Sequence, residues 1–196
     1  MEVVSFLHQK GGTGKSTLAV GAAAALAARG EAVLLMDADY QGTAQEWGNR
    51  FGTRLGVETR SQVQPILHEE VARYRNAVRW LIVDGPPSLS PMTESILRAS
   101  DRVVIPVRPA RPDLWALPWL VAVIKKLRGK GEKPAAKLVF NMVNDEALEP
   151  LRQEIAPLGL PVHPTPLPSH PAFKALFEGQ PLPADLAAQV LALLSP

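Results

Sequence analysis

The sequence predicts an α/β fold in which a mostly parallel, twisted β-sheet is covered by helices on both faces. Continuous apolar runs of strand length recur along the chain, which is typical of parallel strands buried on both sides. Helical runs alternate with these strands, as crossover connections between parallel strands require. A chain of 196 residues fits one domain, and no linker is long enough to divide it, so we expect a single domain over residues 1–196.

Local patterns define the elements of the first half of the chain. The first strand is a continuous apolar run, and the alanine-rich helix that follows it ends before Gly30, which suits the C′ position. A helix over 65–76 is indicated by apolar residues at helical spacing. The predicted strands here are Val3–Leu7, Ala32–Met36, Leu55–Glu58 and Arg79–Val83, and the helices are Ser16–Arg29, Ala44–Phe51, Pro65–Asn76 and Met92–Ala99.

The second half continues the alternation. A long helix is predicted to begin near Pro112, because proline is favoured at the start of a helix. The proline-rich stretch 157–171 is interpreted as a structured loop, since short apolar pieces interrupt it. The predicted strands here are Arg102–Val107, Lys137–Val143 and Leu160–His163, and the helices are Asp113–Leu127, Ala147–Ala156, Ala172–Phe177 and Ala184–Leu194.

Composition excludes several classes of site. The sequence contains no cysteine, so disulfides, zinc–thiolate sites and iron–sulfur clusters held by Cys are excluded. The formal net charge is only +2, so nucleic-acid binding requires a local basic patch. No signal-peptide pattern begins the sequence, and the longest weakly apolar run, Leu18–Ala28, is too short to span a bilayer. We therefore expect a cytoplasmic protein.

The glycine-rich stretch Lys10–Thr17 carries the strongest functional signal. It lies between a predicted strand and a predicted helix, where backbone N–H groups cradle phosphate oxygens. The standard phosphate loop has glycine five residues before Gly14, but Gln9 stands there and a second lysine, Lys10, follows. A glycine-rich turn with chance lysines is the alternative, which the flanking elements disfavour. The predicted nucleotide-binding residues are Gly11, Gly12, Thr13, Gly14, Lys15, Ser16 and Thr17.

Within this loop each residue type has a chemical role. Lys15 is expected to reach the β- and γ-phosphates, and the Ser16 hydroxyl is expected to bind Mg²⁺. Carboxylates follow two of the predicted strands: Asp37 and Asp39 after the second, and Asp84 after the apolar run Trp80–Val83. A strand ending in aspartate is typical of a Mg²⁺ site beside a phosphate loop. Aspartates that cap the following turn are the structural alternative for Asp37 and Asp39.

Taken together, these motifs resemble the deviant Walker A box and its companions in the ParA/MinD family of dimeric ATPases. The chain is most similar to a small ParA-type partition ATPase without an N-terminal helix-turn-helix domain. The resemblance implies that Lys10 crosses a dimer interface to the partner's nucleotide, that Asp39 positions the attacking water, and that Asp37 and Asp84 serve Mg²⁺. Tyr40 stands where many members have proline, which leaves the timing of the first switch open. Residues 85–87 resemble the second switch.

The activity that the resemblance implies is Mg²⁺-dependent hydrolysis of ATP, coupled to ATP-dependent formation of a homodimer. Such a dimer binds double-stranded DNA non-specifically, is stimulated by a centromere-binding adaptor and associates with the nucleoid. One alternative is a positioning ATPase for another cargo, such as a division-site, chemotaxis or carboxysome protein. Another is a MinD-like switch recruited to membranes, which needs a basic amphipathic tail. The tail 184–194 contains no Lys or Arg, so no membrane partner is expected.

Two further sets of contacts are predicted. Asn141 either reads the adenine edge or is a turn residue at a strand end, and the resemblance places the loop 164–168 against the base through Pro166 and Leu167. A basic cluster at 125–137 either binds DNA phosphates or is a solvated helix end. The cluster contains Lys125, Lys126, Arg128, Lys130, Lys133 and Lys137; its first four residues and Lys174 are the main DNA candidates, followed by Arg98, Arg108 and Arg111.

Overall fold

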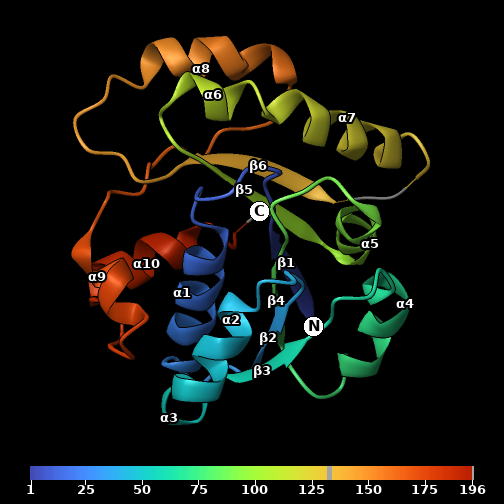
Figure 1. The fold of residues 1–196 in the computed structure, drawn as a ribbon, viewed down its shortest axis with the longest axis vertical. Coiled ribbons are helices and arrows are strands. Elements are labelled where there is room, and N and C mark those ends of the chain that lie inside the picture. Colours follow the sequence, from blue (N-terminus) through green and yellow to red (C-terminus); the bar gives the residue numbers. More distant parts are fainter. Residues whose placement is uncertain (132–133, 196) are drawn as a thin grey trace.

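A computed structural model, which describes residues 1–131 and 134–195, contains one six-stranded sheet (Figure 1). The strand order is β3-β2-β4-β1-β5-β6, and every pairing is parallel. The predicted α/β fold with a parallel sheet is therefore confirmed. The strands are β1 (Glu2–Phe6), β2 (Val33–Asp37), β3 (Glu58–Ser61), β4 (Trp80–Asp84), β5 (Arg102–Val107) and β6 (Ala135–Phe140).

Helices cover both faces of this sheet (Figure 1). One face carries α1 (Lys15–Ala27), α2 (Thr43–Trp47), α9 (Pro171–Leu176) and α10 (Ala184–Ala192). The other face carries α4 (Leu67–Glu70), α5 (Pro91–Ala99), α6 (Arg111–Leu114), α7 (Leu117–Arg128) and α8 (Glu149–Ile155). Short extensions complete these layers: the π-helix η1 (Gly48–Gly52), α3 (Thr53–Leu55), and the 3₁₀ turns η2 (Val71–Tyr74) and η3 (Ala156–Leu158).

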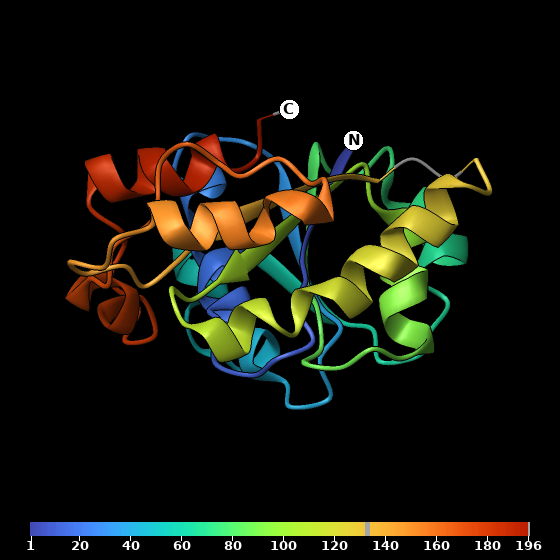
Figure 2. The same cartoon turned by 90° about the horizontal axis from the view of Figure 1, so that it is seen from above.

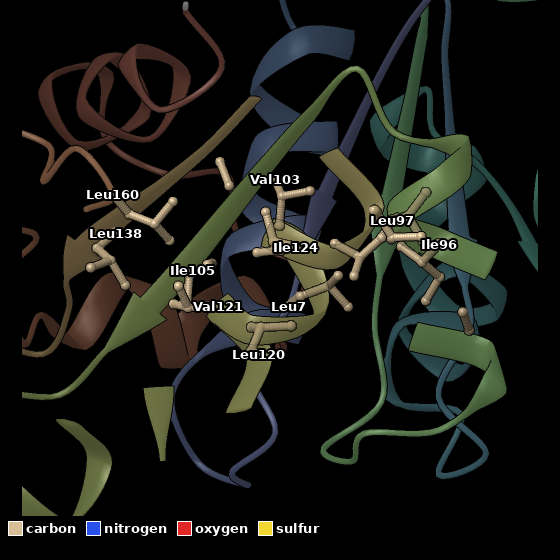
Figure 3. Packing of buried hydrophobic residues seen from close by; sticks show 14 of the residues in the cluster. Leu7, Ile96, Leu97, Val103, Ile105, Leu120, Val121, Ile124, Leu138 and Leu160 are labelled. Carbon is tan, nitrogen blue, oxygen red and sulfur yellow. The ribbon is translucent and has the colours of Figure 1, made fainter. Parts of the chain in front are cut away.

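Two hydrophobic clusters, one on each side of the sheet, hold the layers together. Under α5 and α7, side chains such as Ile96, Leu120 and Ile124 belong to the same buried cluster as Ile105 of β5 (Figure 3). On the opposite side, the alanines of α1 let that helix approach the strands closely, and Leu186 and Val190 of α10 are buried there. Burial of this kind is the main favourable term in folding. It fixes the carboxyl ends of the strands in one row.

The third strand lies three residues later than Leu55–Glu58, so that prediction is wrong. The helical segment continues through η1 and α3 because Gly56, with φ 71°, ends it in a left-handed conformation. Val57 is buried as a connector rather than as part of the strand. The strand itself is polar because it is an edge strand, paired only with β2.

Three other predicted elements are shorter or divided. The helix Asp113–Leu127 is split into α6 and α7, because Pro118 has no N–H with which to continue the first helix. The helix Pro65–Asn76 shortens to α4 and η2, whose tight turn keeps Val71 and Tyr74 on the core side. The strand Leu160–His163 reduces to a single bridge between Val162 and Leu138. Prolines at 161 and 164 flank it and cannot donate to a ladder.

The sixth strand ends at Phe140 rather than at Val143. Asn141 turns toward the loop after β1, and Met142 has φ 59°, which a strand cannot accommodate. Met142 is the non-glycine residue with positive φ in the described chain. Within residues 1–131 and 134–195, no helix is long and apolar enough to cross a membrane.

Candidate nucleotide-binding site

The glycine-rich loop connects β1, in the middle of the sheet, to the start of α1. Parallel α/β sheets place their ligands in this position, beyond the carboxyl ends of the strands. Gly14 precedes α1 with φ 95°, and no side chain of the described residues caps this helix. The first amides of α1 are therefore available to an anion, and the helix dipole favours negative charge there. The loop has the geometry predicted for a phosphate cradle.

Asn141 holds this loop in place. Its Nδ2 donates to Thr13 O at 2.8 Å, and its side chain is buried. A Cβ atom on Gly14 would lie 2.2 Å from Asn141 Nδ2, so glycine is needed for this close approach as well as for its φ. The two readings of Asn141 from the sequence were base recognition and a turn. The structure adds a third role, a brace between β6 and the phosphate loop.

Lys15 points inward from the first turn of α1. Its side chain is 6% exposed, and its Nζ donates to Lys10 O at 3.1 Å. Burial lowers the pKa of Lys15, while the nearby carboxylates of Asp84 and Asp39 oppose that shift. The structure therefore gathers one cation and two carboxylates from three separate segments. A bound polyphosphate would meet all three groups.

Asp84 is the most unusual group in this site. It is 0% exposed, and neither carboxylate oxygen accepts a hydrogen bond that meets normal geometry from residues 1–131 and 134–195. Burial raises its pKa to about 7, the Ser16 hydroxyl opposes that shift, and the charge of Asp37 adds to it. An unpartnered buried carboxylate is costly unless a cation compensates it. Ser16 and Asp84 are hard oxygen donors and fit Mg²⁺.

No group of three or more His, Asp or Glu side chains capable of holding a metal occurs in the described part of the chain. A site of the phosphate-loop type needs no such group, because one hydroxyl and one carboxylate bind Mg²⁺ together with substrate phosphates and water. The Mg²⁺ ligands Ser16 and Asp84 stay a prediction.

Asp37 has a structural role in this geometry. Its Oδ1 accepts the N–H of Asp39 at 3.0 Å, and its Oδ2 accepts the N–H of Gln45 at 2.7 Å. The carboxylate therefore binds the turn between β2 and α2, although burial raises its pKa. Asp39, by contrast, is partly exposed and accepts only the N–H of Gln41 in the described chain. The Mg²⁺ role predicted for Asp37 stays a prediction, and the geometry favours the structural alternative.

Lys10 forms an ion pair that the sequence did not predict. Its Nζ donates to the buried carboxylate of Asp113 in α6. Arg108 donates to the same carboxylate twice, through Nε at 2.6 Å and Nη2 at 3.0 Å. Burial alone would raise the pKa of Asp113, but these hydrogen bonds lower it. The Arg108 guanidinium, one of the further DNA candidates, is thus engaged beside the phosphate loop.

His8 is hydrogen-bonded to the backbone of the same loop. It is buried, and its Nδ1 accepts the N–H of Lys10 at 2.9 Å. Burial, together with the charge of Lys15, lowers the pKa of His8 to about 4. The ring is therefore neutral at physiological pH, with Nδ1 as the acceptor. The ring packs in the interior.

A pocket of about 300 Å³ opens beside Thr17 on the far side of the loop. It is lined by Thr17, Asn141, Met142, Pro168, Ser169, His170, Phe173, Lys174 and Phe177. Leu167, one of the two base contacts predicted from the resemblance, is instead 1% exposed and packs in the core under α1. Pro166 is partly exposed. Lys174 lies at this pocket rather than with the other basic candidates.

The basic cluster divides in the structure. Lys125, Lys126 and Lys130 are exposed at the end of α7. Arg128 donates to Pro134 O, and Lys137 donates to Ser195 O, so both have backbone partners. Lys133 lies outside the described residues. Arg98 pairs with Glu94, and Arg111 lies 3.8 Å from Glu154.

This combination of features defines a nucleotide-binding protein of the phosphate-loop class. A glycine loop leads into an uncapped helix, a lysine is buried beside two carboxylates, and a parallel sheet positions them. The family model for the CobQ/CobB/MinD/ParA nucleotide-binding domain matches residues 4–182. The chain belongs to this family, as its motifs predicted.

The relatives include a carboxysome-distribution protein and a chromosome-partitioning ATPase. The maintenance of carboxysome distribution protein A of Gloeobacter kilaueensis is 43% identical over 116 residues, which cover 59% of this chain but only 53% of that protein. The chromosome-partitioning ATPase Soj of Thermus thermophilus is 31% identical over 71% of this chain and 68% of its own length. The MinD structure in the MinC:MinD complex of Aquifex aeolicus matches with a TM-score of 0.77 at 19% identity, covering 99% of this chain and 94% of that chain. The last match supports the fold alone.

Proposed function

We propose that this chain is a Mg²⁺-dependent ATPase that works as an ATP-driven dimerisation switch. The buried, unpartnered carboxylate of Asp84 beside Ser16 and Lys15 carries this proposal. Ser16 and Asp84 would hold Mg²⁺, which would supply charge neutralisation at the phosphates. The loop amides and Lys15 bind and orient the phosphates. The partly exposed Asp39 orients the water that attacks the γ-phosphate.

The base occupies the pocket beside Thr17 in this proposal. Phe173 and Phe177 offer apolar surface for a planar ring, and Asn141 lies between this pocket and the phosphate loop. The same asparagine therefore braces the loop and borders the base. Pro168 and His170 take the place that the resemblance gave to Leu167.

Dimerisation is proposed because Lys10 points away from its own loop toward α6. In the ATP-bound dimer, Lys10 leaves Asp113 and contacts the phosphates held by the other copy. Such a cation, supplied by the other subunit, would stabilise the charge of the transition state in the same way as an arginine finger. ATP drives this association only if it binds the dimer more tightly than the monomer.

Sedimentation tests this switch directly. With ATP and Mg²⁺, the Asp39→Ala variant should sediment as a dimer, because ATP binds but turnover is blocked. The wild type should form this dimer transiently, and both should be monomers with ADP or without nucleotide. Monomers under all three conditions, with ATP binding verified, would contradict the proposal.

We further propose that the dimer binds double-stranded DNA non-specifically through Lys125, Lys126 and Lys130. These cations are exposed along the end of α7, and Arg128 and Lys174 contribute less because of their positions. Cationic side chains bind DNA by releasing its counterions, which makes the affinity salt-dependent. The C-terminal helix α10 buries Leu186 and Val190 against α1, which favours DNA over a membrane as the surface.

Charge reversal at Lys125 and Lys126 is expected to weaken DNA binding and to lower the salt slope of the dimer by about 3.6, at about 0.9 for each of the four lost phosphate contacts. ATPase activity without DNA should stay unchanged. Arg29→Glu/Arg75→Glu is the matched control, since it alters net charge equally at exposed positions away from α7. Filter binding across a salt series measures the DNA affinity and its salt slope for each variant. An equal loss in the control would show that only overall charge matters.

The cargo is either a DNA molecule or another cellular body. The Soj relative, a chromosome-partitioning ATPase, supports partition of DNA, for which we propose a centromere-binding adaptor as the partner. The Gloeobacter kilaueensis relative equally supports positioning of a carboxysome. In either case we propose that the ATP-bound dimer associates with the nucleoid and that an adaptor stimulates hydrolysis. The two cases differ only in what the adaptor carries.

A further inference from the structure

An exposed aromatic patch lies around the junction of α6 and α7, outside the nucleotide-binding site. Trp115, which follows the last residue of α6, is 64% exposed, and Trp119 of α7 is 68% exposed. Leu89 is also exposed and, together with Val123, lines a pocket of about 310 Å³ between α5 and α7. These four residues, Leu89, Trp115, Trp119 and Val123, are called the aromatic patch below. In Figure 2, α6 and α7 run along the outside of the molecule.

The core does not require these tryptophans. The opposite side of α7 buries Leu120, Val121 and Ile124 against the sheet, so this helix is already anchored (Figure 3). Scattered single apolar residues on a surface are ordinary, whereas adjoining large ones mark an interaction surface. Tryptophan is also among the residues most enriched at the centres of protein interfaces. The aromatic patch therefore has the character of an interaction surface.

Two chain segments connect the aromatic patch to the nucleotide site. Asp113, which holds Lys10 and Arg108, lies two residues before Trp115. Leu89 follows Asp84 by five residues, after the segment 85–87 that resembles the second switch. Short stretches of chain thus link the aromatic patch to the residues that bind the γ-phosphate and Mg²⁺ under the proposed function.

We propose that the aromatic patch is a contact surface for a second copy of this chain in the ATP-bound dimer. This inference rests on the proposed function, in which Lys10 reaches the other copy's nucleotide. Lys10 borders the patch through Asp113, so a second copy close enough to receive Lys10 lies against α6. In a two-fold dimer the same surface recurs on both copies, and each patch faces its counterpart or the surface beside it.

The area of the patch suits this occupant. A tryptophan buries about 150–250 Å² when fully covered, so the two exposed tryptophans offer roughly 400–650 Å² over both copies. That is about a third of a standard interface of ~1,600 Å². Lys126, near the end of α7, and Lys130, two residues after this helix, follow the patch along the chain and are exposed to meet DNA. The dimer contact and the DNA contact therefore occupy successive parts of the chain.

Trp115→Ala/Trp119→Ala in the Asp39→Ala background tests the inference. We expect ATP-dependent dimerisation to weaken by at least about tenfold in Kd, while the monomer still binds a fluorescent ATP analogue. Trp80→Phe is the control, because Trp80 lies at the amino end of β4, away from the loop. With Trp80→Phe present, ATP should also shift tryptophan emission to the blue, as exposed rings become buried.

The outcomes separate the two proposals. If the Asp39→Ala protein itself stays monomeric with ATP, the proposed switch fails. If it dimerises and the double tryptophan variant dimerises equally well, only the aromatic patch assignment is overturned. A blue shift that needs DNA or anionic vesicles, with dimerisation unaffected by the substitutions, would also overturn it and identify a different occupant.

Discussion

Replacing Asp84 with asparagine should lower the rate of Mg²⁺-dependent ATP hydrolysis by about 100-fold or more and stabilise the nucleotide-free protein at neutral pH. The carboxylate is fully buried, and within the described chain neither of its oxygens has a hydrogen-bond partner. Asparagine keeps the size of the side chain and removes its charge. The variant thus loses the Mg²⁺ ligand and, with it, the cost of burying a carboxylate.

The stability gain has a defined pH dependence. The pKa of Asp84 is raised to about 7 in the folded protein, from 3.8, so between these values the folded state holds more protons than the unfolded state. Wild-type stability therefore falls as pH rises from about 4 to 7, by up to roughly 4 kcal/mol, and then levels off. Below pH 4 this contribution disappears, and the difference from Asp84→Asn should become independent of pH.

Urea unfolding between pH 4 and 8 measures this divergence, and hydrolysis assays with and without Mg²⁺ measure the activity. Saturating Mg²⁺ and ATP should stabilise the wild type more than the variant, since the cation compensates the ionised carboxylate. A variant with full activity, or a stability difference that does not change with pH, would rule out the assigned role of Asp84.

Gly14→Ala should disrupt the phosphate loop. The new Cβ atom would lie 2.2 Å from Asn141 Nδ2, and the residue would keep φ 95°. We expect a loss of about 2–4 kcal/mol in unfolding free energy from strain and from the broken Asn141–Thr13 hydrogen bond. ATP affinity should fall by about 100-fold, because misplaced amides no longer meet the phosphates. Urea unfolding and nucleotide titration measure the two effects.

Two further variants separate backbone strain from the collision. Gly30 also has positive φ, but a Cβ atom there meets nothing within 4 Å, so Gly30→Ala should cost only about 1 kcal/mol and leave ATP binding intact. In Gly14→Ala/Asn141→Ala the collision is removed, and part of the lost stability should return. If Gly14→Ala lowers the unfolding free energy no more than Gly30→Ala does, the close packing of Asn141 on the loop does not contribute to stability.

Local signals predicted the sheet and most of the nucleotide site. The apolar runs at β1, β2 and β4 each end beside a glycine loop or an aspartate, and parallel pairing brings those ends together: Phe6 and Asp37 are both in register with Asp84. The register follows from the fold class, so Lys15, Ser16 and Asp84 could be grouped from sequence. Strand β3 was misplaced because an edge strand is polar and lacks the pattern that identifies buried strands.

Contacts between distant segments were beyond the reach of the sequence. The Asn141–Thr13 hydrogen bond joins residues 128 positions apart, and the Lys10–Asp113 pair spans 103 positions. Neither leaves a periodic pattern or a short motif. The structural role of Asp37 was foreseen only as an alternative, because an aspartate after a strand suits both a turn and a metal. Which one applies depends on the amide of Gln45, on the next helix.

The double hydrogen bond from Arg108 to Asp113 makes Lys10 an exchangeable ligand. If Lys10 alone neutralised that carboxylate, its departure would strand a buried charge at a cost of several kcal/mol. Arg108 stays behind as a resident counterion, so Lys10 can move to a phosphate while Asp113 remains compensated. The free-energy cost of moving Lys10 to a phosphate on the other copy thus comes mainly from the contacts that Lys10 itself loses. Under the proposed function, Lys10 can therefore stay bound to Asp113 in the monomer and still dissociate from it when the dimer forms.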